Sequence, residues 1–218
     1  MRTAVVLFAY QRPRYLKKCL ASLENVAGLE YYAFVDYSPM QRGIARMIKE
    51  LGFFNVIERE RKYGLSENIV QGISKMFQLG YEAVIVIEDD IVLEPDALRY
   101  LTINLIKHKD DKRVGQINLQ GNSPSSHGWA IWKDRWDRLD FDRVPLEGHL
   151  AKMYDKHKTW DLVLHHNFDM LGLVAIGRKL AKHIGTIGEH YNILSNFGIR
   201  KFIRKMTNRT GTQCSLTY

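Results

Sequence analysis

The sequence of 218 residues is poor in cysteine and shows no pattern of a secretory signal. Its two cysteines, Cys19 and Cys214, are too few for a disulfide framework and do not have the spacing of a zinc site. The first apolar segment, residues 4–9, is too short for a signal sequence or a membrane span, and no small-residue cleavage site follows it. These absences favour a reducing compartment, so we expect a cytoplasmic protein.

Glycine is missing from the loop that follows this first apolar segment, Ala9-Tyr10-Gln11-Arg12-Pro13. Dinucleotide-binding dehydrogenases and nucleotidyltransferases use a glycine-rich loop there, because glycine lets the backbone approach phosphate groups. The absence argues against both classes. A nucleotidyltransferase with a similar α/β fold stays open as an alternative function.

Acidic residues are missing from the C-terminal tail, residues 196–218. The tail carries five basic residues: Arg200, Lys201, Arg204, Lys205 and Arg209. Two interpretations stay open, a solvated tail and a contact with anionic groups such as a membrane surface. Aromatic residues are not interleaved with the basic ones as base stacking would require, so we expect no nucleic-acid partner. A non-catalytic binding module that uses this tail is a further alternative.

The rest of the sequence has the composition and patterning of an α/β protein. Its content of 45% hydrophobic and 26% charged residues is that of an ordinary globular chain. Predicted strands at residues 4–9, 32–35, 55–57, 83–87 and 114–119 alternate with amphipathic helical patterns. This alternation predicts a mainly parallel sheet with flanking helices.

Three consecutive carboxylates, Glu88, Asp89 and Asp90, follow the apolar segment of residues 83–87. The segment is largely β-branched and predicts a strand buried on both faces, whose carboxyl end is the usual ligand-binding edge of such a sheet. Adjacent carboxylates repel one another unless a cation or a ligand holds them. A hard divalent cation bound to a diphosphate suits this position. Asp90 lies five residues before Pro95, too far to cap the helix that begins there.

All four tryptophans lie between residues 129 and 160, after a loop of turn-forming residues at 121–128. Indole rings suit sugar rings as well as protein cores, so this stretch is a candidate to line an acceptor site. Trp132 and Trp136 are four residues apart, which predicts that they share one helical face and pack in the core.

Four segments together resemble the GT-A-fold glycosyltransferases, in particular the N-acetylglucosaminyltransferase I type and its bacterial relatives. They are Ala9-Tyr10-Gln11-Arg12, Val35-Asp36, residues 86–96, and Gly128-Trp129 with the later Thr159-Trp160-Asp161. The resemblance covers roughly residues 3–165. It implies a GT-A-like, Rossmann-type α/β fold with an elaborated C-terminal acceptor region.

The resemblance also implies a metal-dependent transfer of a sugar from a nucleotide sugar, expected to be a UDP-sugar, to an acceptor hydroxyl with inversion. Asp90 would bind Mn²⁺ (or Mg²⁺), Asp89 would face the ribose, and Glu88 would contact the donor sugar or support the metal shell. Asp36 would accept a hydrogen bond from uracil, and Arg12 would lie beside the base or the phosphates. Asp36 ending a turn and Arg12 as a solvated residue at a helix entry stay open as alternatives. Trp129 is the tryptophan expected to bind the donor.

An inverting transfer needs a general base for the acceptor hydroxyl. Asp161 is the candidate, because Trp160-Asp161 resembles the Trp-Asp of the N-acetylglucosaminyltransferase I pattern. Other acids in this region compete for the role: Asp134, Asp137, Glu147 and Asp155.

Of the eight histidines, His190 is the one candidate metal ligand. It lies in a glycine-punctuated loop, and some GT-A enzymes complete the metal shell with a C-terminal histidine. His108, His149, His157 and His183 are predicted on polar helical stretches, and the adjacent His165 and His166 would diverge on a helix, so these six are not expected to bind metal.

These predictions describe one catalytic domain over residues 1–195 and a basic tail over residues 196–218. Residues 1–120 would bind the nucleotide sugar, and residues 121–195 would bind a glycan, lipid-linked or protein acceptor. We expect an enzyme in the cytoplasm, with peripheral membrane contact through the tail left open.

Overall fold

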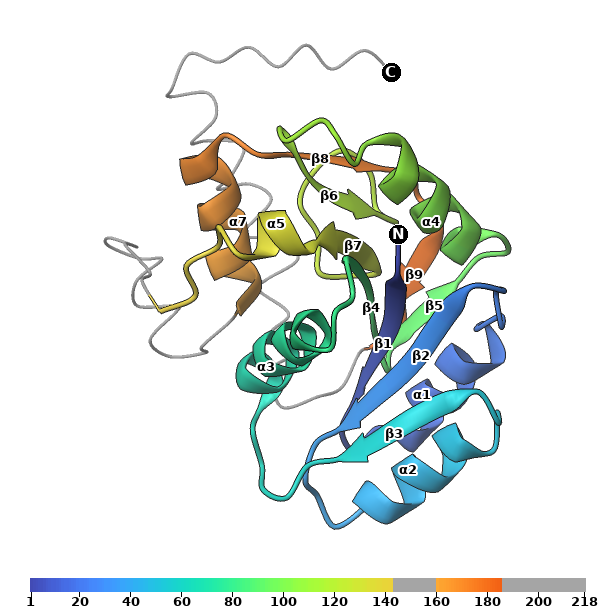
Figure 1. The fold of residues 1–218 in the computed structure, drawn as a ribbon. Coiled ribbons are helices and arrows are strands. Elements are labelled where there is room, and N and C mark those ends of the chain that lie inside the picture. Colours follow the sequence, from blue (N-terminus) through green and yellow to red (C-terminus); the bar gives the residue numbers. More distant parts are fainter. Residues whose placement is uncertain (143–159, 186–218) are drawn as a thin grey trace. The chain divides into compact units, whose positions relative to one another are not determined.

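Helices cover both faces of a seven-stranded sheet in the computed structural model, which describes residues 1–142 and 160–185 (Figure 1). The chain divides into two units, Met1–Ile184 and Gly185–Tyr218, and all described elements belong to the first. Glu147, Asp155, His190 and the basic tail lie outside the described residues. The predicted boundary at residue 195 and the division at residue 120 stay predictions.

The sheet has the strand order β3-β2-β1-β4-β7-β6-β8. Its strands are β1 (Thr3–Ala9), β2 (Leu29–Val35), β3 (Phe54–Glu58), β4 (Ala83–Glu88), β6 (Val114–Asn118), β7 (Trp129–Trp132) and β8 (Val174–Gly177). Strands β1 to β4 are mutually parallel, and β8 is parallel to β6. Strand β7 is antiparallel to both of its neighbours, β4 and β6. The predicted α/β fold with a mainly parallel sheet is therefore confirmed.

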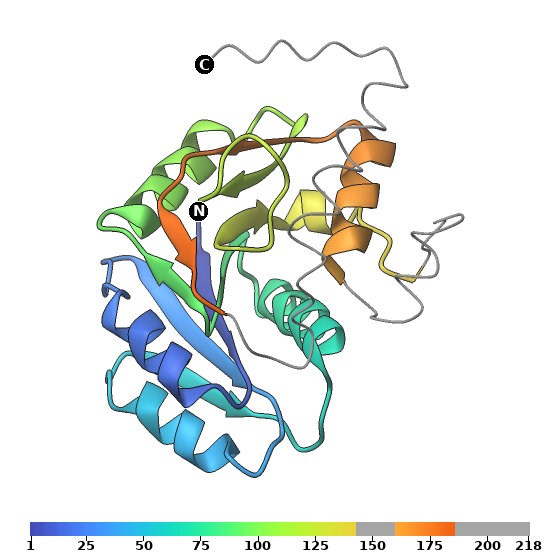
Figure 2. The same cartoon turned by 180° about the vertical axis from the view of Figure 1, so that it is seen from behind.

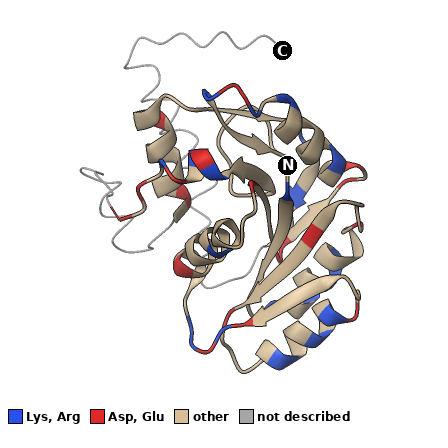
Figure 3. Cartoon of the chain, in the orientation of Figure 1, with Lys and Arg blue, Asp and Glu red and all other residues tan. Residues whose placement is uncertain are grey.

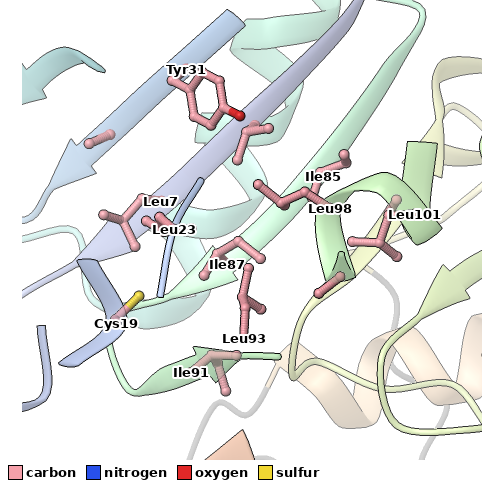
Figure 4. Close-up of a cluster of buried hydrophobic side chains, with 14 of the residues drawn as sticks. Leu7, Cys19, Leu23, Tyr31, Ile85, Ile87, Ile91, Leu93, Leu98 and Leu101 are labelled. Carbon is pink, nitrogen blue, oxygen red and sulfur yellow. The ribbon is translucent and has the colours of Figure 1, made fainter. Parts of the chain in front are cut away.

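Strand β1 is buried on both faces, and its alternate side chains enter two separate cores. Val5 and Leu7 pack in the core beneath α1, α2 and α4, part of which is drawn in Figure 4. Val6 and Phe8 pack in the core beneath α3, α5 and α7. This period of two follows from the pleat of a strand, and burial on both faces explains the continuous apolar sequence.

The helices form one layer on each face of the sheet (Figures 1 and 2). They are α1 (Pro13–Ala21), α2 (Gln41–Lys49), α3 (Leu65–Gln78), α4 (Ala97–Lys107), α5 (Lys133–Trp136) and α7 (Trp160–Leu171). Helix α1 begins at Pro13 as predicted, because proline fixes a helical φ and lacks the N–H that the first turn leaves unbonded. None of the helices in the described part of the chain reaches the length and hydrophobicity that a membrane span requires.

The two tryptophans predicted on one helical face lie on opposite faces of the sheet. Trp132 belongs to β7 and packs in the α1/α2/α4 core, whereas Trp136 belongs to α5 and packs in the other. Their burial was predicted, but the shared helical face was wrong because a strand ends between them.

A second sheet of two short strands packs beside α1. Strands β5 (Ile91–Leu93) and β9 (Ala181–His183) are antiparallel, and Ile91 pairs with His183. His183 was predicted on a helical stretch. The prediction was wrong because pairing with β5, a segment distant in sequence, makes this part of the chain extended.

Close packing of α3 on β1 gives a stability prediction. A Cβ atom added to Gly72 of α3 would lie 2.5 Å from Phe8 Cε1, whereas one added to the exposed Gly43 of α2 would meet nothing within 4 Å. We expect Gly72→Ala to lower the free energy of unfolding by about 1–3 kcal/mol through overpacking. The matched Gly43→Ala variant is expected to raise it by about 0.5–1 kcal/mol, because alanine has the better helix propensity. Urea unfolding of both variants tests this, and a Gly72→Ala protein as stable as the wild type would contradict the packing.

Candidate active site

The carboxyl ends of β1, β2 and β4 meet at one edge of the sheet. The backbone N–H of Asp36 donates to the carbonyl of Ala9, and that of Asp89 donates to the carbonyl of Phe8, at 2.9 and 3.0 Å. The residues that follow the three strands are therefore neighbours, although they are far apart in sequence. This edge brings together Arg12, Asp36 and the three consecutive acids, as the sequence predicted for the ends of parallel strands.

Arg12 forms ion pairs with two of the three acids. Its Nη1 donates to Asp90 Oδ2 at 2.5 Å, and its Nη2 donates to Asp89 Oδ1. The backbone N–H of Tyr10 donates to the other oxygen of Asp89 at 3.1 Å. Asp89 and Asp90 are 1% and 4% exposed, so the guanidinium neutralises carboxylates that water cannot reach. Arg12 is therefore a structural counter-charge here and not only a solvated residue at a helix entry.

The three acids differ in electrostatic character. Burial raises the pKa of Glu88 well above its ordinary value, and repulsion from Asp90 raises it further. Burial also raises the pKa of Asp89, against the opposing charge of Arg12. Burial acts in the same direction on Asp90, but a hydrogen bond from His183 and the charge of Arg12 outweigh it and lower the pKa of Asp90. Asp90 is thus the acid that stays ionised most readily.

His183 was missed by sequence reasoning, and the structure brings it to Asp90. Its Nε2 lies 3.1 Å from Asp90 Oδ2, and its ring stacks on that of His127 with centroids 4.5 Å apart. The register of β9 on β5 creates this contact across 93 positions of sequence, and no local pattern carries that information. Within residues 1–142 and 160–185, no three histidine, cysteine, aspartate or glutamate side chains are arranged to hold a metal ion.

The loop of residues 119–128, which carries His127, is held by two buried polar side chains of β6. Asn118 Oδ1 accepts hydrogen bonds from the N–H groups of Gln120 and Gly121, at 2.8 and 3.1 Å. Gln116 exchanges two hydrogen bonds of 2.9 Å with the backbone of Ser125. Both side chains are fully buried. Polar residues in the otherwise apolar strand of residues 114–119 were the signal that could have identified these anchors.

Asp36 organises the loop that follows β3. Its carboxylate accepts hydrogen bonds from the N–H groups of Tyr37, Tyr63 and Gly64, at 2.9, 2.8 and 2.8 Å. Ending a turn was one of the two roles considered for Asp36, and these bonds show that its carboxylate anchors the backbone of residues 37, 63 and 64. A carboxylate offers about four acceptor positions, so three such bonds leave room for one more partner. The predicted bond to uracil stays a prediction.

Arg59 and Lys62 add positive charge beside Asp36. The Arg59 guanidinium lies 4.5 Å from the ring centroids of Phe34 and Tyr63, and its Nε donates to Asn68 Oδ1 at 2.8 Å. Lys62 Nζ lies 5.2 Å from the centroid of the Tyr10 ring. These cations and aromatic rings give the acidic edge a wall suited to an anion with a planar base.

Asp161 lies in the first turn of α7, directly after Trp160. Burial raises the pKa of Asp161, against the opposing influence of His165. Its charge in turn contributes to the raised pKa of Glu88, so α7 brings the predicted base within electrostatic reach of the acidic edge. Two competing acids are engaged on the surface, Asp134 with Lys112 at 2.7 Å and Asp137 with Lys133.

Trp129 is completely buried and stacks on Trp160, with centroids 5.7 Å apart. Its indole Nε1 has no hydrogen-bond partner among the residues that the structure describes. The tryptophan pair therefore packs β7, the neighbour of β4, against α7, the helix that carries Asp161. The predicted contact of Trp129 with the donor stays a prediction.

The raised pKa of Glu88 predicts a stability change that depends on pH. Because the folded-state pKa lies above the unfolded-state value, the wild-type free energy of unfolding falls as pH rises between the two values. Glutamine cannot ionise, so Glu88→Gln should be more stable than the wild type by about 1–2 kcal/mol at about pH 8. The gain should vanish below about pH 4, where the carboxyl is protonated in both states.

Urea unfolding at both pH values tests this, with Glu94→Gln as the control for removing an exposed carboxylate. A gain that is equal at the two pH values, or no gain, would contradict the electrostatic assignment.

Comparison with known proteins supports the fold and the family. A family model described as glycosyl transferase family 2 matches residues 4–205. A comparison with curated proteins finds no match. Among solved structures, S. aureus TarS 1–349 in complex with UDP-GlcNAc aligns over 99% of this chain and 68% of its own, with 12% identity and a TM-score of 0.57.

Two further solved structures have a similar fold. S. aureus TarS 1–349 aligns over 81% of this chain and 58% of its own, with 13% identity and a TM-score of 0.53. A cytidylyltransferase from Leptospira borgpetersenii serovar Hardjo-bovis aligns over 100% and 99%, with 11% identity and a TM-score of 0.51. At these identities the likeness concerns the fold alone. The chain spans only 22% of the TarS chain in another crystal structure.

The family match extends over almost the whole sequence, from the first strand into the tail. It confirms the resemblance to GT-A-fold glycosyltransferases, while the nearer resemblance to the N-acetylglucosaminyltransferase I type stays a prediction. The chain belongs to glycosyl transferase family 2.

Proposed function

We propose that this protein transfers a sugar from a nucleotide sugar to an acceptor hydroxyl. The observation that carries the proposal is the buried acidic edge of Glu88, Asp89 and Asp90, held by Arg12 in a chain of glycosyl transferase family 2. Such an edge combines acids for a cation and a ribose with an arginine for a diphosphate. The donor that we propose is a UDP-sugar, which is consistent with the UDP-GlcNAc named for the TarS complex.

Asp90 and His183 are the residues proposed to hold a divalent cation, Mn²⁺ or Mg²⁺. Asp90 is ionised, and the imidazole Nε2 of His183 lies 3.1 Å from its Oδ2, so the pair offers one oxygen and one nitrogen donor. The donor set fits a cation that takes its remaining ligands from a diphosphate and water. Such a cation, when bound, would stabilise the charge that develops on the departing nucleoside diphosphate.

Arg12 changes partner in this proposal. It neutralises Asp89 and Asp90 when no donor is bound, and a planar guanidinium fork also matches the oxygens of a diphosphate. Donor binding would release Arg12 from the acids and engage it with the diphosphate. The two acids would then be free for the cation and the ribose.

Asp161 is proposed as the general base. Burial raises the pKa of Asp161, which increases its affinity for a proton. Helix α7 holds Asp161 near enough to the acidic edge for its charge to raise the pKa of Glu88. Asp161 would take the proton of the acceptor hydroxyl as the sugar is transferred with inversion. A glycan, a lipid-linked sugar and a protein all remain proposed acceptor classes.

A nucleotidyltransferase is the alternative, since a cytidylyltransferase shares the fold. The loop from Ala9 to Pro13 contains no glycine, which disfavours it. Release of UDP from UDP-sugars would support the proposed function. Release of pyrophosphate from CTP and a sugar phosphate, without any UDP release, would support the alternative.

The cation site predicts the behaviour of Asp90→Ala. Wild-type protein should bind UDP more tightly in Mn²⁺ than in EDTA, by calorimetry, and Asp90→Ala should remove this difference. His183→Gln should reduce it, because one donor remains. Both variants should keep a cooperative thermal transition. The exposed Asp110→Ala serves as the control for removing a carboxylate, and a full Mn²⁺ effect in Asp90→Ala would refute the assignment.

The proposed base predicts a kinetic defect in Asp161→Asn. Turnover, measured as UDP release from the best of a panel of nucleotide sugars, should fall by about 10²-fold or more, as is typical for loss of a general base. UDP affinity in Mn²⁺ should be unchanged, since Asp161 does not contact the donor in this proposal. Asp134→Asn should behave as the wild type, and near-normal turnover of Asp161→Asn would move the role to another acid.

A further inference from the structure

Helices α1 and α2 lie side by side on one face of the sheet and carry an excess of positive charge. Five exposed cations project from them, and they are here called the basic helix face: Arg14, Lys17, Lys18, Arg42 and Arg46. Neither helix contains an acidic residue, and Figure 3 marks both in blue and not in red. This face has no part in the site at the acidic edge.

The cations of the basic helix face are not neutralised by their surroundings. None of the five forms an ion pair with any residue in the described ranges, 1–142 and 160–185. Many exposed cations elsewhere are paired: Arg2 with Glu30, Arg61 with Glu67, Lys109 with Glu82, Lys112 with Asp134, Arg113 with Asp111 and Lys133 with Asp137. The five unpaired cations of α1 and α2 therefore stand together on two adjacent helices, while further unpaired cations such as Lys75, Lys107 and Arg178 lie elsewhere in the described part of the chain.

Two hollows in this surface are large enough for a phosphate headgroup. One, of about 520 Å³, is lined by Arg42, Arg46, Lys49, Glu50 and Glu58. Lys49 pairs with Glu58 at 3.0 Å, so an anion would meet the two cations Arg42 and Arg46 and one acid, Glu50, which is a net positive lining. The other, of about 390 Å³, lies between the helices and is lined by one cation, one acid and four apolar residues: Lys17, Glu50, Leu20, Ala21, Met47 and Leu51. Cations beside partly apolar walls suit the phosphate and glycerol parts of a lipid headgroup.

An apolar tip adjoins the basic helix face. The turn that leads into α2 exposes Tyr37 and Met40, whose exposed fractions are 52% and 45%. Both lie within five residues of Arg42 in the sequence. Exposed aromatic and apolar side chains beside lysine and arginine are the combination found where proteins contact a membrane surface.

We infer that the basic helix face binds the surface of a membrane that contains anionic phospholipids, with Tyr37 and Met40 entering the headgroup region. A nucleic acid is less suited, because the one aromatic residue of the two helices, Tyr15, is partly buried, so the five cations are not interleaved with exposed rings on which bases could stack. The inference stands independently of the proposed function and uses neither the cation site nor the basic tail. Because α1 and α2 begin just after Arg12 and Asp36, a bound membrane would lie beside the edge that carries the candidate active site.

Vesicle sedimentation with the full chain tests the inference. Wild-type protein should bind phosphatidylcholine vesicles that contain about one third phosphatidylglycerol, and not pure phosphatidylcholine, with affinity that falls as salt is raised from about 0.1 to 1 M. The double variant Lys17→Glu/Arg46→Glu should bind the anionic vesicles about 30-fold or more weakly. Its thermal transition should be unchanged, since neither side chain has an ion-pair partner among the described residues.

A matched control separates this face from net charge and from the tail. Lys75→Glu/Lys107→Glu makes the same change in net charge at exposed positions of α3 and α4. It should bind anionic vesicles within a few-fold of the wild type. Equal losses in the two double variants, no loss in either, or no wild-type binding would overturn the inference. Wild-type binding to single-stranded DNA but not to vesicles would also overturn it.

Discussion

The ion pairs from Arg12 to Asp89 and Asp90 are the interaction on which the candidate active site depends. Three consecutive carboxylates, all at most 9% exposed, would otherwise repel one another at the end of a buried strand. The counter-charge comes from the residue that precedes α1, so the helix start also fixes the electrostatics of the edge. The shifted pKa values of these buried acids at the ligand-binding edge of the sheet are what make the cluster a candidate for function.

The two cores of the sheet let its two sides take different roles. On one side, α7 packs Trp160 against Trp129 and places Asp161 where its charge raises the pKa of Glu88. On the other side, α1 and α2 bury their apolar faces and turn their cations outward. The acidic edge lies where these layers meet the ends of β1 and β4. One side of the sheet thus supplies the proposed base, and the other supplies the proposed membrane surface.

Most of the first half of the fold could be predicted from local patterns. The strands at residues 4–9 and 83–87 and the helix start at Pro13 agree with the structure to within a residue. The second half was harder because its elements are short and depend on distant partners. Trp132 was predicted to be helical and lies in a strand, and His183 was predicted to be helical and pairs with Ile91. The anchors Gln116 and Asn118 also depend on a loop whose path the sequence does not reveal.

The sequence by itself determined the α/β class, the parallel strands and the acidic edge, because each depends on the period and polarity of residues that are close in the chain. The tertiary structure alone decided which groups meet at that edge. Arg12 reaches Asp90 across 78 positions and His183 reaches it across 93. Such contacts follow from strand order and register, which are set by burying the whole sheet at once. No local sequence pattern records them.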